Sequence, residues 1–116
     1  RQQQSAQTRL RLDDQQEQVR VQTTQAFYDW ESAMQEVRSL RSQVRSARTQ
    51  LEAIQTGFEV GRRTSIDVLN AQQDYFDALR NLSQARNRYL LSRLQLKSAA
   101  GVLTMADMAA VNRQLD

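Results

Sequence analysis

The feature that most constrains this chain is an unbroken alternation of three- and four-residue steps between apolar or small residues. In the first half the series comprises Trp30, Ala33, Val37, Leu40, Val44, Ala47, Leu51, Ile54 and Phe58. One of its two seven-residue repeats extends back through Ala26, Val19 and Leu12. Such spacing is typical of the a and d positions of a coiled coil. It predicts a first helix over about residues 5–60, with a length of roughly 75–80 Å.

A second heptad series follows residue 64, and in it large and small side chains alternate. The large members are Val68, Tyr75, Leu82, Tyr89 and Leu96, and the small members are Ala71, Ala78, Ala85, Ser92 and Ala99. Small residues let a neighbouring backbone approach closely, while the large ones fill the space beside them. A strict seven-residue period also implies left-handed supercoiling. The series predicts a second helix over residues 65–100, antiparallel to the first.

Residues with known capping preferences mark the ends of these helices. Gly61 can end the first helix in the left-handed conformation, and Thr64 to Asp67 resembles a capping box in which Asp replaces the usual Glu. The expected tip turn therefore covers residues 61–64.

The same pattern recurs near the end of the chain. Gly101 is expected to end the second helix, and Thr104 to Asp107 to start a short third helix over residues 104–115. That helix would carry Met108, Val111 and Leu115 on one side.

The composition fits long helices better than a compact globule. The chain has no Pro and three Gly among 116 residues, so few helix breakers interrupt it. No run approaches the ~18 apolar residues of a membrane helix. We expect one all-α domain over residues 1–116, read as a piece of a longer protein. Because an antiparallel pair alone would leave much of each helix exposed, further helices from other segments or subunits should pack beside it.

Several classes of function have little support. The chain has no His and no Cys, and its acidic residues form no convincing catalytic or metal-binding set, so we expect no enzyme, no catalytic residue, no metal and no cofactor. The net charge of +3 admits nucleic-acid binding, but the arginines are diluted by Gln, Ser and Asp and form no basic cluster. A class that the heptads do support is a structural coiled-coil or adaptor module that only pairs helices.

Two motifs are more specific than a heptad repeat. The stretch GFEVGRRTSIDVLNAQ, residues 57–72, contains a G-x-R-T-x-x-D-V-L tip, and a Y-x-L-x-x-L-x-L-K-x-A-x-G segment follows within residues 85–112. Over roughly residues 20–115 the chain resembles the TolC family of outer-membrane efflux and secretion channels, at the periplasmic hairpin of the second internal repeat.

This resemblance implies a homotrimer whose helices build a periplasmic α-barrel beneath a barrel anchored in the outer membrane. The chain would then be a periplasmic duct segment without a membrane span of its own. Its partners would be a periplasmic adaptor and, through the adaptor, an inner-membrane pump or transporter. Drug efflux and type I protein secretion both remain open, as does the substrate.

The resemblance also assigns roles to residues at the tip. The adaptor-docking residues would be Gly57, Val60, Gly61, Arg63 and Thr64, and the entrance gate would comprise Phe58, Arg63, Asp67 and Asn70. Arg63 would help to hold the entrance closed, and Asp67 would line the constriction. Phe58 lacks the hydroxyl of the family's Tyr, and Asn70 stands where a second Asp can occur, so we expect weaker divalent-cation block than in a channel with two aspartates.

Each of these residues also has a plain structural interpretation. Asp67 can act only as a cap, and Arg62 and Arg63 can be ordinary solvated side chains. Asp67, Asn70, Asp74 and Asp77 step by three, four and three along one helical face. That face can be a solvent-exposed stripe or the lining of a water-filled lumen. Tyr75, Phe76 and Tyr89 are interpreted as packing residues.

Overall fold

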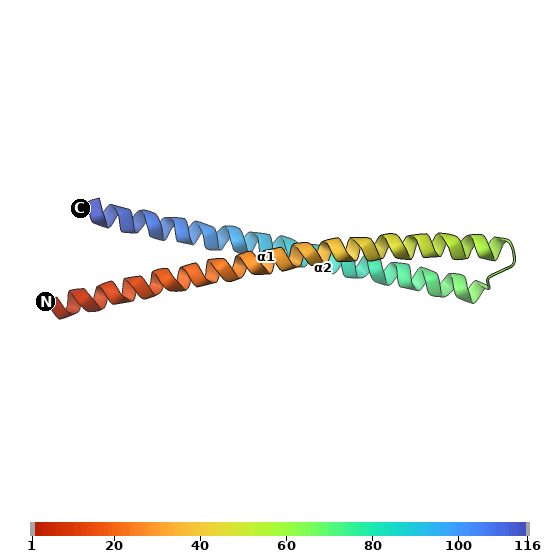
Figure 1. Cartoon of the computed structure of the whole chain (residues 1–116), viewed down its shortest axis with the longest axis horizontal. Helices are drawn as coiled ribbons and strands as arrows, with labels where there is room; N and C mark the ends of the chain where they lie inside the picture. Colours follow the sequence, from red (N-terminus) through yellow and green to blue (C-terminus); the bar gives the residue numbers. More distant parts are fainter. Residues whose placement is uncertain (1, 116) are drawn as a thin grey trace. The chain divides into compact units, whose positions relative to one another are not determined.

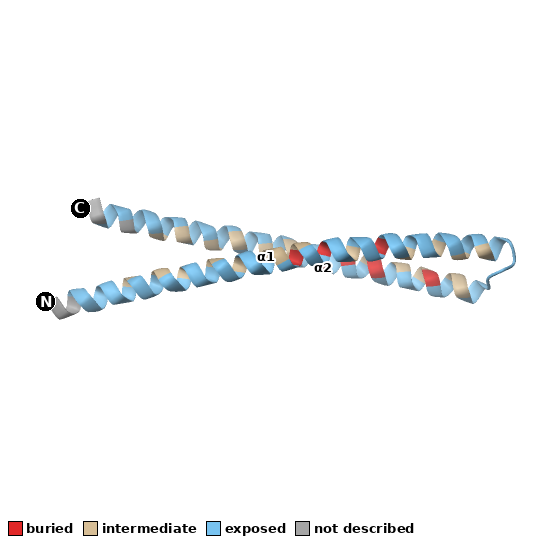
Figure 2. Cartoon of the chain, in the orientation of Figure 1, coloured by how far each residue is buried: buried red, intermediate tan, exposed pale blue. Residues whose placement is uncertain are grey.

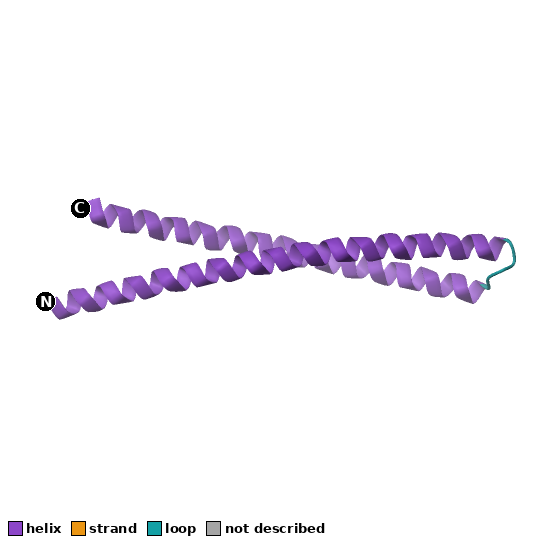
Figure 3. Ribbon diagram, in the orientation of Figure 1, coloured by secondary structure: helices purple, strands orange, loops and turns teal. Residues whose placement is uncertain are grey.

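The computed structural model describes residues 2–115, with the side chains of residues 5–109 and 111–113. Helix α1 spans Gln2–Glu59 and helix α2 spans Ser65–Leu115 (Figure 1). Within residues 2–115 the turn at residues 60–64 is the only break in the helical structure (Figure 3). The prediction of an all-α helical hairpin is confirmed, whereas the trimeric barrel stays a prediction. Within the same residues neither helix has a segment long and apolar enough to cross a membrane.

The contacts divide the chain into two compact units, and the tip belongs to unit 2, Ser32–Leu90. All seven hydrophobic residues that are buried in the described part of the chain lie in this unit (Figure 2). They are Ala33, Val37 and Val44 of α1 and Ala71, Ala78, Leu82 and Ala85 of α2. Every one is a seam position of the heptad series. Because four of the seven are alanines, the two helices of this unit can approach closely.

Polar contacts between the helices flank this core. The Arg88 side chain of α2 forms an ion pair with Glu36 of α1. Nearer the turn, the Nε and Nη2 groups of Arg48 donate hydrogen bonds of 3.3 and 3.2 Å to the hydroxyl oxygen of Tyr75. Both ion-pair side chains are about half exposed, so the pair contributes little to stability.

Unit 1 comprises residues 1–31 and 91–116. Its described seam residues, such as Leu12, Val19, Leu96 and Ala99, are half-buried. The Thr23 hydroxyl contacts the Val19 carbonyl oxygen at 2.8 Å and the Ala99 carbonyl oxygen at 3.3 Å. In this unit too, the heptad pattern correctly predicts which side of each helix faces the other helix, although the seam residues are less buried than in unit 2. The expectation of a single domain stays a prediction.

The predicted break at Gly101 and the separate third helix at 104–115 are wrong, because α2 continues through both. The Thr104 hydroxyl donates to the Ala100 carbonyl oxygen at 2.9 Å, a bond inside the helix, instead of capping a new one. Leu103 and Ala106 are half-buried and extend the seam past the glycine. A single glycine costs a helix only about 1 kcal/mol, which a continuing seam can offset.

Met108 and Val111, which were expected on one side of that third helix, do line one shallow groove of α2, although both side chains are exposed. Met108 is 63% exposed and Val111 is 54% exposed. The side chain of Leu115 lies outside the described residues.

The uninterrupted helix leads to a prediction for Gly101. A Cβ atom added there would meet no heavy atom within 4 Å. Gly101→Ala is therefore expected to stabilise the chain by about 0.5–1 kcal/mol, since alanine restricts the unfolded chain and favours the helix. Thermal unfolding followed by far-UV circular dichroism measures the change. A lower midpoint than that of the unmodified chain would indicate that the helix breaks at this residue after all.

Candidate functional site

The tip turn begins with a hydrogen-bonded end to helix α1. Gly61 has a φ of 79°, in the left-handed region that glycine adopts without strain. Its N–H donates to the Phe58 carbonyl oxygen at 3.1 Å, and the N–H of Arg62 donates to the Gly57 carbonyl oxygen at 2.7 Å. This pair of bonds is the Schellman motif, which satisfies carbonyl groups that a helix end otherwise leaves free. The expected C-cap at Gly61 is confirmed.

The start of helix α2 is closed by a reciprocal pair of hydrogen bonds. The N–H of Asp67 donates to Thr64 Oγ1 at 3.2 Å, and the N–H of Thr64 donates to Asp67 Oδ2 at 3.0 Å. This arrangement is a capping box with Asp in the position that Glu usually takes. The predicted cap is therefore confirmed, and both ends of the five-residue turn are fixed by local bonds.

The capping bonds also set the charge state of Asp67. Its pKa lies below the ordinary value, chiefly because the Thr64 N–H stabilises the carboxylate. Partial desolvation opposes this shift, while the Thr64 side chain and the positive charge of Arg63 add to it. Asp67 is thus held as an anion at the base of the tip. It lies close enough to Arg63 to be affected by that residue's charge.

A pH dependence follows from the direction of this shift. Because the folded-state pKa is lowered, the stabilisation is complete above the unfolded-state pKa of about 4 and is lost as the pH falls through the folded-state value. We expect Asp67→Asn to remove this part of the acid sensitivity, measured as thermal midpoints over an acid pH series. Asp74→Asn, on the exposed face of α2, is the control and should retain it. An acid profile of Asp67→Asn that matches the unmodified chain would contradict the role of the cap.

Arg63 lies against the last turn of helix α1. Its N–H donates to the Gly57 carbonyl oxygen at 3.2 Å, so this carbonyl accepts bonds from both arginines of the turn. The Cγ atom of Arg63 is only 2.7 Å from the point where a Cβ atom of residue 57 would stand. The structure thus brings Gly57 and Arg63 together.

Four large apolar side chains within seven residues of these arginines in the sequence are exposed. The exposed fraction is 48% for Phe58, 65% for Val60, 66% for Ile66 and 54% for Leu69. The heptad series had placed Phe58 in the seam, which is wrong: Gly57 is the half-buried residue of the last turn, three residues after Ile54. We define the tip surface as Phe58, Val60, Ile66 and Leu69 together with Arg62 and Arg63.

The sequence interpretation missed Ile66 and Leu69 as members of the tip surface. A signal for them was present, since both are large apolar residues outside the heptad series that is buried in α2. A large apolar residue that a coiled-coil seam does not use must either face solvent or contact another molecule.

The acidic stripe stays on the outside of this unit. Asn70, Asp74 and Asp77 are exposed, whereas Asp67 is half-buried by its cap. Asp77 pairs with Arg80 at 3.7 Å within the same helix. The stripe is therefore accessible from solvent, and its position along a lumen stays a prediction.

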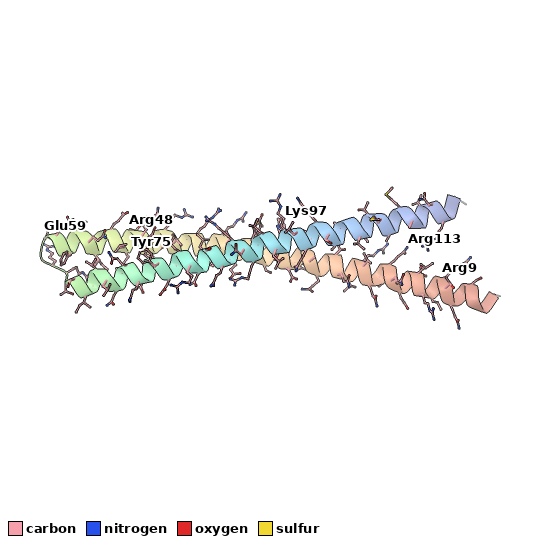
Figure 4. All side chains as sticks on the ribbon, turned by 180° about the vertical axis from the view of Figure 1, so that it is seen from behind. Arg9, Arg48, Glu59, Tyr75, Lys97 and Arg113 are labelled. Atoms are coloured by element: carbon pink, nitrogen blue, oxygen red, sulfur yellow. The ribbon has the colours of Figure 1, made fainter. Side chains whose placement is uncertain are left out.

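A second feature that the sequence did not indicate is the link between Arg48 and Tyr75 (Figure 4). In addition to the two hydrogen bonds, the guanidinium carbon of Arg48 lies 5.8 Å from the centroid of the Tyr75 ring. The bond to Tyr75 raises the pKa of Arg48. Tyr75 packs against the core as expected, and it also connects the two helices that carry the tip.

Taken together, the geometry at the tip offers a rigid, capped turn with exposed apolar side chains and two arginines. An exposed apolar patch with arginines is the composition that protein-binding surfaces favour. Within residues 2–115 no group of three His, Cys, Asp or Glu side chains is arranged to hold a metal ion.

Comparison with known proteins gives a consistent set of relatives. A family model described as outer membrane efflux protein matches residues 1–102. The outer membrane protein TolC of Vibrio cholerae is 49% identical over 61 residues, which are 53% of this chain and 14% of that protein. TolC of Escherichia coli is 41% identical over 61 residues, 53% of this chain and 12% of the relative. The alkaline protease secretion protein AprF of Pseudomonas aeruginosa is 41% identical over 51 residues, 44% of this chain and 11% of the relative.

Proposed function

This chain belongs to the outer membrane efflux protein family, and from that premise we propose that it forms a periplasmic hairpin of a TolC-like outer-membrane channel. Its matches cover only 14% and 12% of the two TolC relatives, which fits a segment of a longer protein. The hairpin serves as part of the duct wall and not as a catalyst. The cargo is a drug-like molecule or a secreted protein. Similarity to an alkaline protease secretion protein supports keeping secreted proteins among the candidate cargoes.

The main support for this proposal is the composition of the tip surface. Val60 and Ile66 are about two-thirds exposed although both are aliphatic, and they stand beside Arg62 and Arg63. Apolar side chains exposed close to arginines are the composition typical of protein-binding surfaces. We assign the tip surface to docking of a periplasmic adaptor, through which an inner-membrane pump or transporter supplies energy. Gly57, Gly61 and Thr64 then shape this surface, while Val60 and Arg63 contact the adaptor.

Exposed apolar residues away from the tip support assembly with further helices. In unit 2 an open groove of about 390 Å³ is lined by Met34, Val37, Arg38, Arg41, Arg86, Tyr89 and Leu90. Among the described residues none of its three arginines has an ion-pair partner. A helix of a neighbouring hairpin with apolar and acidic side chains would fill it. This surface supports the α-barrel of a homotrimer.

We assign the entrance gate to four residues at the tip: Phe58, Arg63, Asp67 and Asn70. Arg63 holds the entrance closed by bonding to a neighbouring hairpin, and Asp67 contributes one carboxylate per subunit to the constriction. The cap uses Asp67 Oδ2, which leaves Oδ1 for a cation or an arginine. Phe58 cannot donate a hydroxyl bond and Asn70 carries no charge, so this gate is held by fewer polar contacts than one with Tyr and a second Asp.

Single-channel conductance of the full-length channel in planar bilayers tests this assignment. Because like charges brought together by symmetry attract cations, divalent ions should block the channel, and Asp67→Ala should abolish the block. Asn70→Ala is the matched control on the same face and should leave the block in place. Strong block that disappears in Asn70→Ala and persists in Asp67→Ala would overturn the assignment.

A further inference from the structure

The three glycines of this chain differ in backbone conformation and in what a side chain would meet. Gly61 has positive φ, and a Cβ atom at Gly101 would stand in open space. Gly57 fits neither case. Its backbone is helical, without positive φ, and a Cβ atom there would lie 2.7 Å from Arg63 Cγ. Real Cβ atoms do not come this close to another heavy atom, so an alanine at residue 57 would have to displace the arginine.

Glycine is less favourable than alanine in a helix interior, but a contact that a side chain would block can offset this cost. At Gly57 the compensation is the aliphatic stem of Arg63. The three atoms nearest to the missing Cβ all belong to that side chain: Cγ at 2.7 Å, Cβ at 3.6 Å and Cδ at 4.0 Å. Long charged side chains gain from laying their stems on the backbone while the head group stays in water.

The backbone of the turn is held at the same residue. The Gly57 carbonyl oxygen accepts the N–H groups of Arg62 and Arg63 at 2.7 and 3.2 Å. Residue 57 therefore fixes both where the Arg63 backbone lies and where the first carbons of its side chain lie. Because each fixed torsion removes alternative rotamers, the guanidinium is left with a smaller region to explore.

We propose that Gly57 is the positioning residue for Arg63: the space left by its missing side chain holds the Arg63 stem and presents the guanidinium at the tip. This inference rests on the proposed function, in which the guanidinium closes the entrance. It differs from the docking role assigned to Gly57 above, since here the glycine acts through the arginine and contacts no partner. Adding a single methyl group at residue 57 should then change the closing of the entrance in the same direction as removing the Arg63 side chain.

The test compares variants of the full-length channel by single-channel recording in planar bilayers. Arg63→Ala is expected to raise the open-to-closed ratio by at least about tenfold, since loss of a charge-assisted hydrogen bond in even one subunit produces a change of that size. Gly57→Ala should raise it in the same direction. The double variant should open no more than Arg63→Ala alone, because both changes remove one interaction. Gly101→Ala is the matched control, and it should record as the unmodified channel.

Gly57→Ser adds the same Cβ with a different helix propensity and must reproduce the Gly57→Ala result. Assembly of each variant is checked by size-exclusion chromatography, so that conductance is compared between intact channels. If Arg63→Ala opens the channel while both Gly57 variants record as the unmodified protein, the positioning role is refuted and the gate stands. Additive effects in the double variant would refute it as well. If Arg63→Ala itself changes nothing, the gate assignment fails and the positioning role fails with it.

Discussion

Replacing Leu82 with alanine is expected to lower the free energy of unfolding of the chain by about 2–3 kcal/mol. Leu82 is 6% exposed and belongs to the cluster formed by Val37, Val44, Ala78 and Ala85. It is the largest of these side chains, so its removal leaves a cavity that alanine neighbours cannot fill. The value lies toward the lower end of the range for buried leucines, because two helices can close on a gap more readily than a full core.

Urea unfolding of the two proteins at one pH measures this difference. Leu94→Ala on the same helix is the matched control, since Leu94 is 64% exposed. Its effect should stay within about 0.5 kcal/mol. Equal losses for Leu82→Ala and Leu94→Ala would mean that the chain does not pair its helices along the seam.

Gly61→Val is expected to destabilise the tip turn by at least roughly 1–2 kcal/mol. A residue with a Cβ pays roughly 1–2 kcal/mol in the left-handed region, and a β-branched one is a true outlier there. The substitution has open space around it, with no heavy atom within 4 Å of the added Cβ. Backbone strain alone therefore accounts for the expected loss, and repacking cannot relieve it.

Gly61→Asn separates this strain from other effects of losing glycine. Asparagine tolerates the left-handed conformation, while both replacements restrict the unfolded chain. The valine variant should therefore be less stable than the asparagine variant by about 1 kcal/mol in urea unfolding. If the two unfold alike, positive φ at residue 61 is not required, and the Schellman motif does not hold the end of α1.

The periodic pattern predicted most of the packing surface, and the reasons for its two errors are specific. Phe58 satisfied a four-residue step, but in the last turn of α1 Gly57 is the half-buried residue, and the stem of Arg63 lies against it. Gly101 satisfied the rule for a helix end, but the seam continues beyond it through Leu103 and Ala106. In both cases a local rule was overridden by contacts with residues elsewhere.

The candidate site divides in the same way. The cap formed by Thr64 and Asp67 could be predicted, since its bonds join residues three apart. The exposure of Ile66 and Leu69 needed the structure, although their absence from the seam hinted at it. The assignment of docking and gating to these residues comes from the family and from the tip surface, and conductance measurements decide it.

By itself, the sequence determined the two helices, their seam and the capped turn between them. These features depend on hydrogen bonds and repeats that act within a few residues, so the residue types are sufficient to specify them. Only the tertiary structure decided which glycine makes room for Arg63, which apolar residues remain exposed at the tip, and that Arg48 meets Tyr75. The contact of Gly57 with Arg63 depends on the path of the turn. The link between Arg48 and Tyr75 depends on the register of one helix against the other, which is fixed by how side chains distant in sequence fill the space between them.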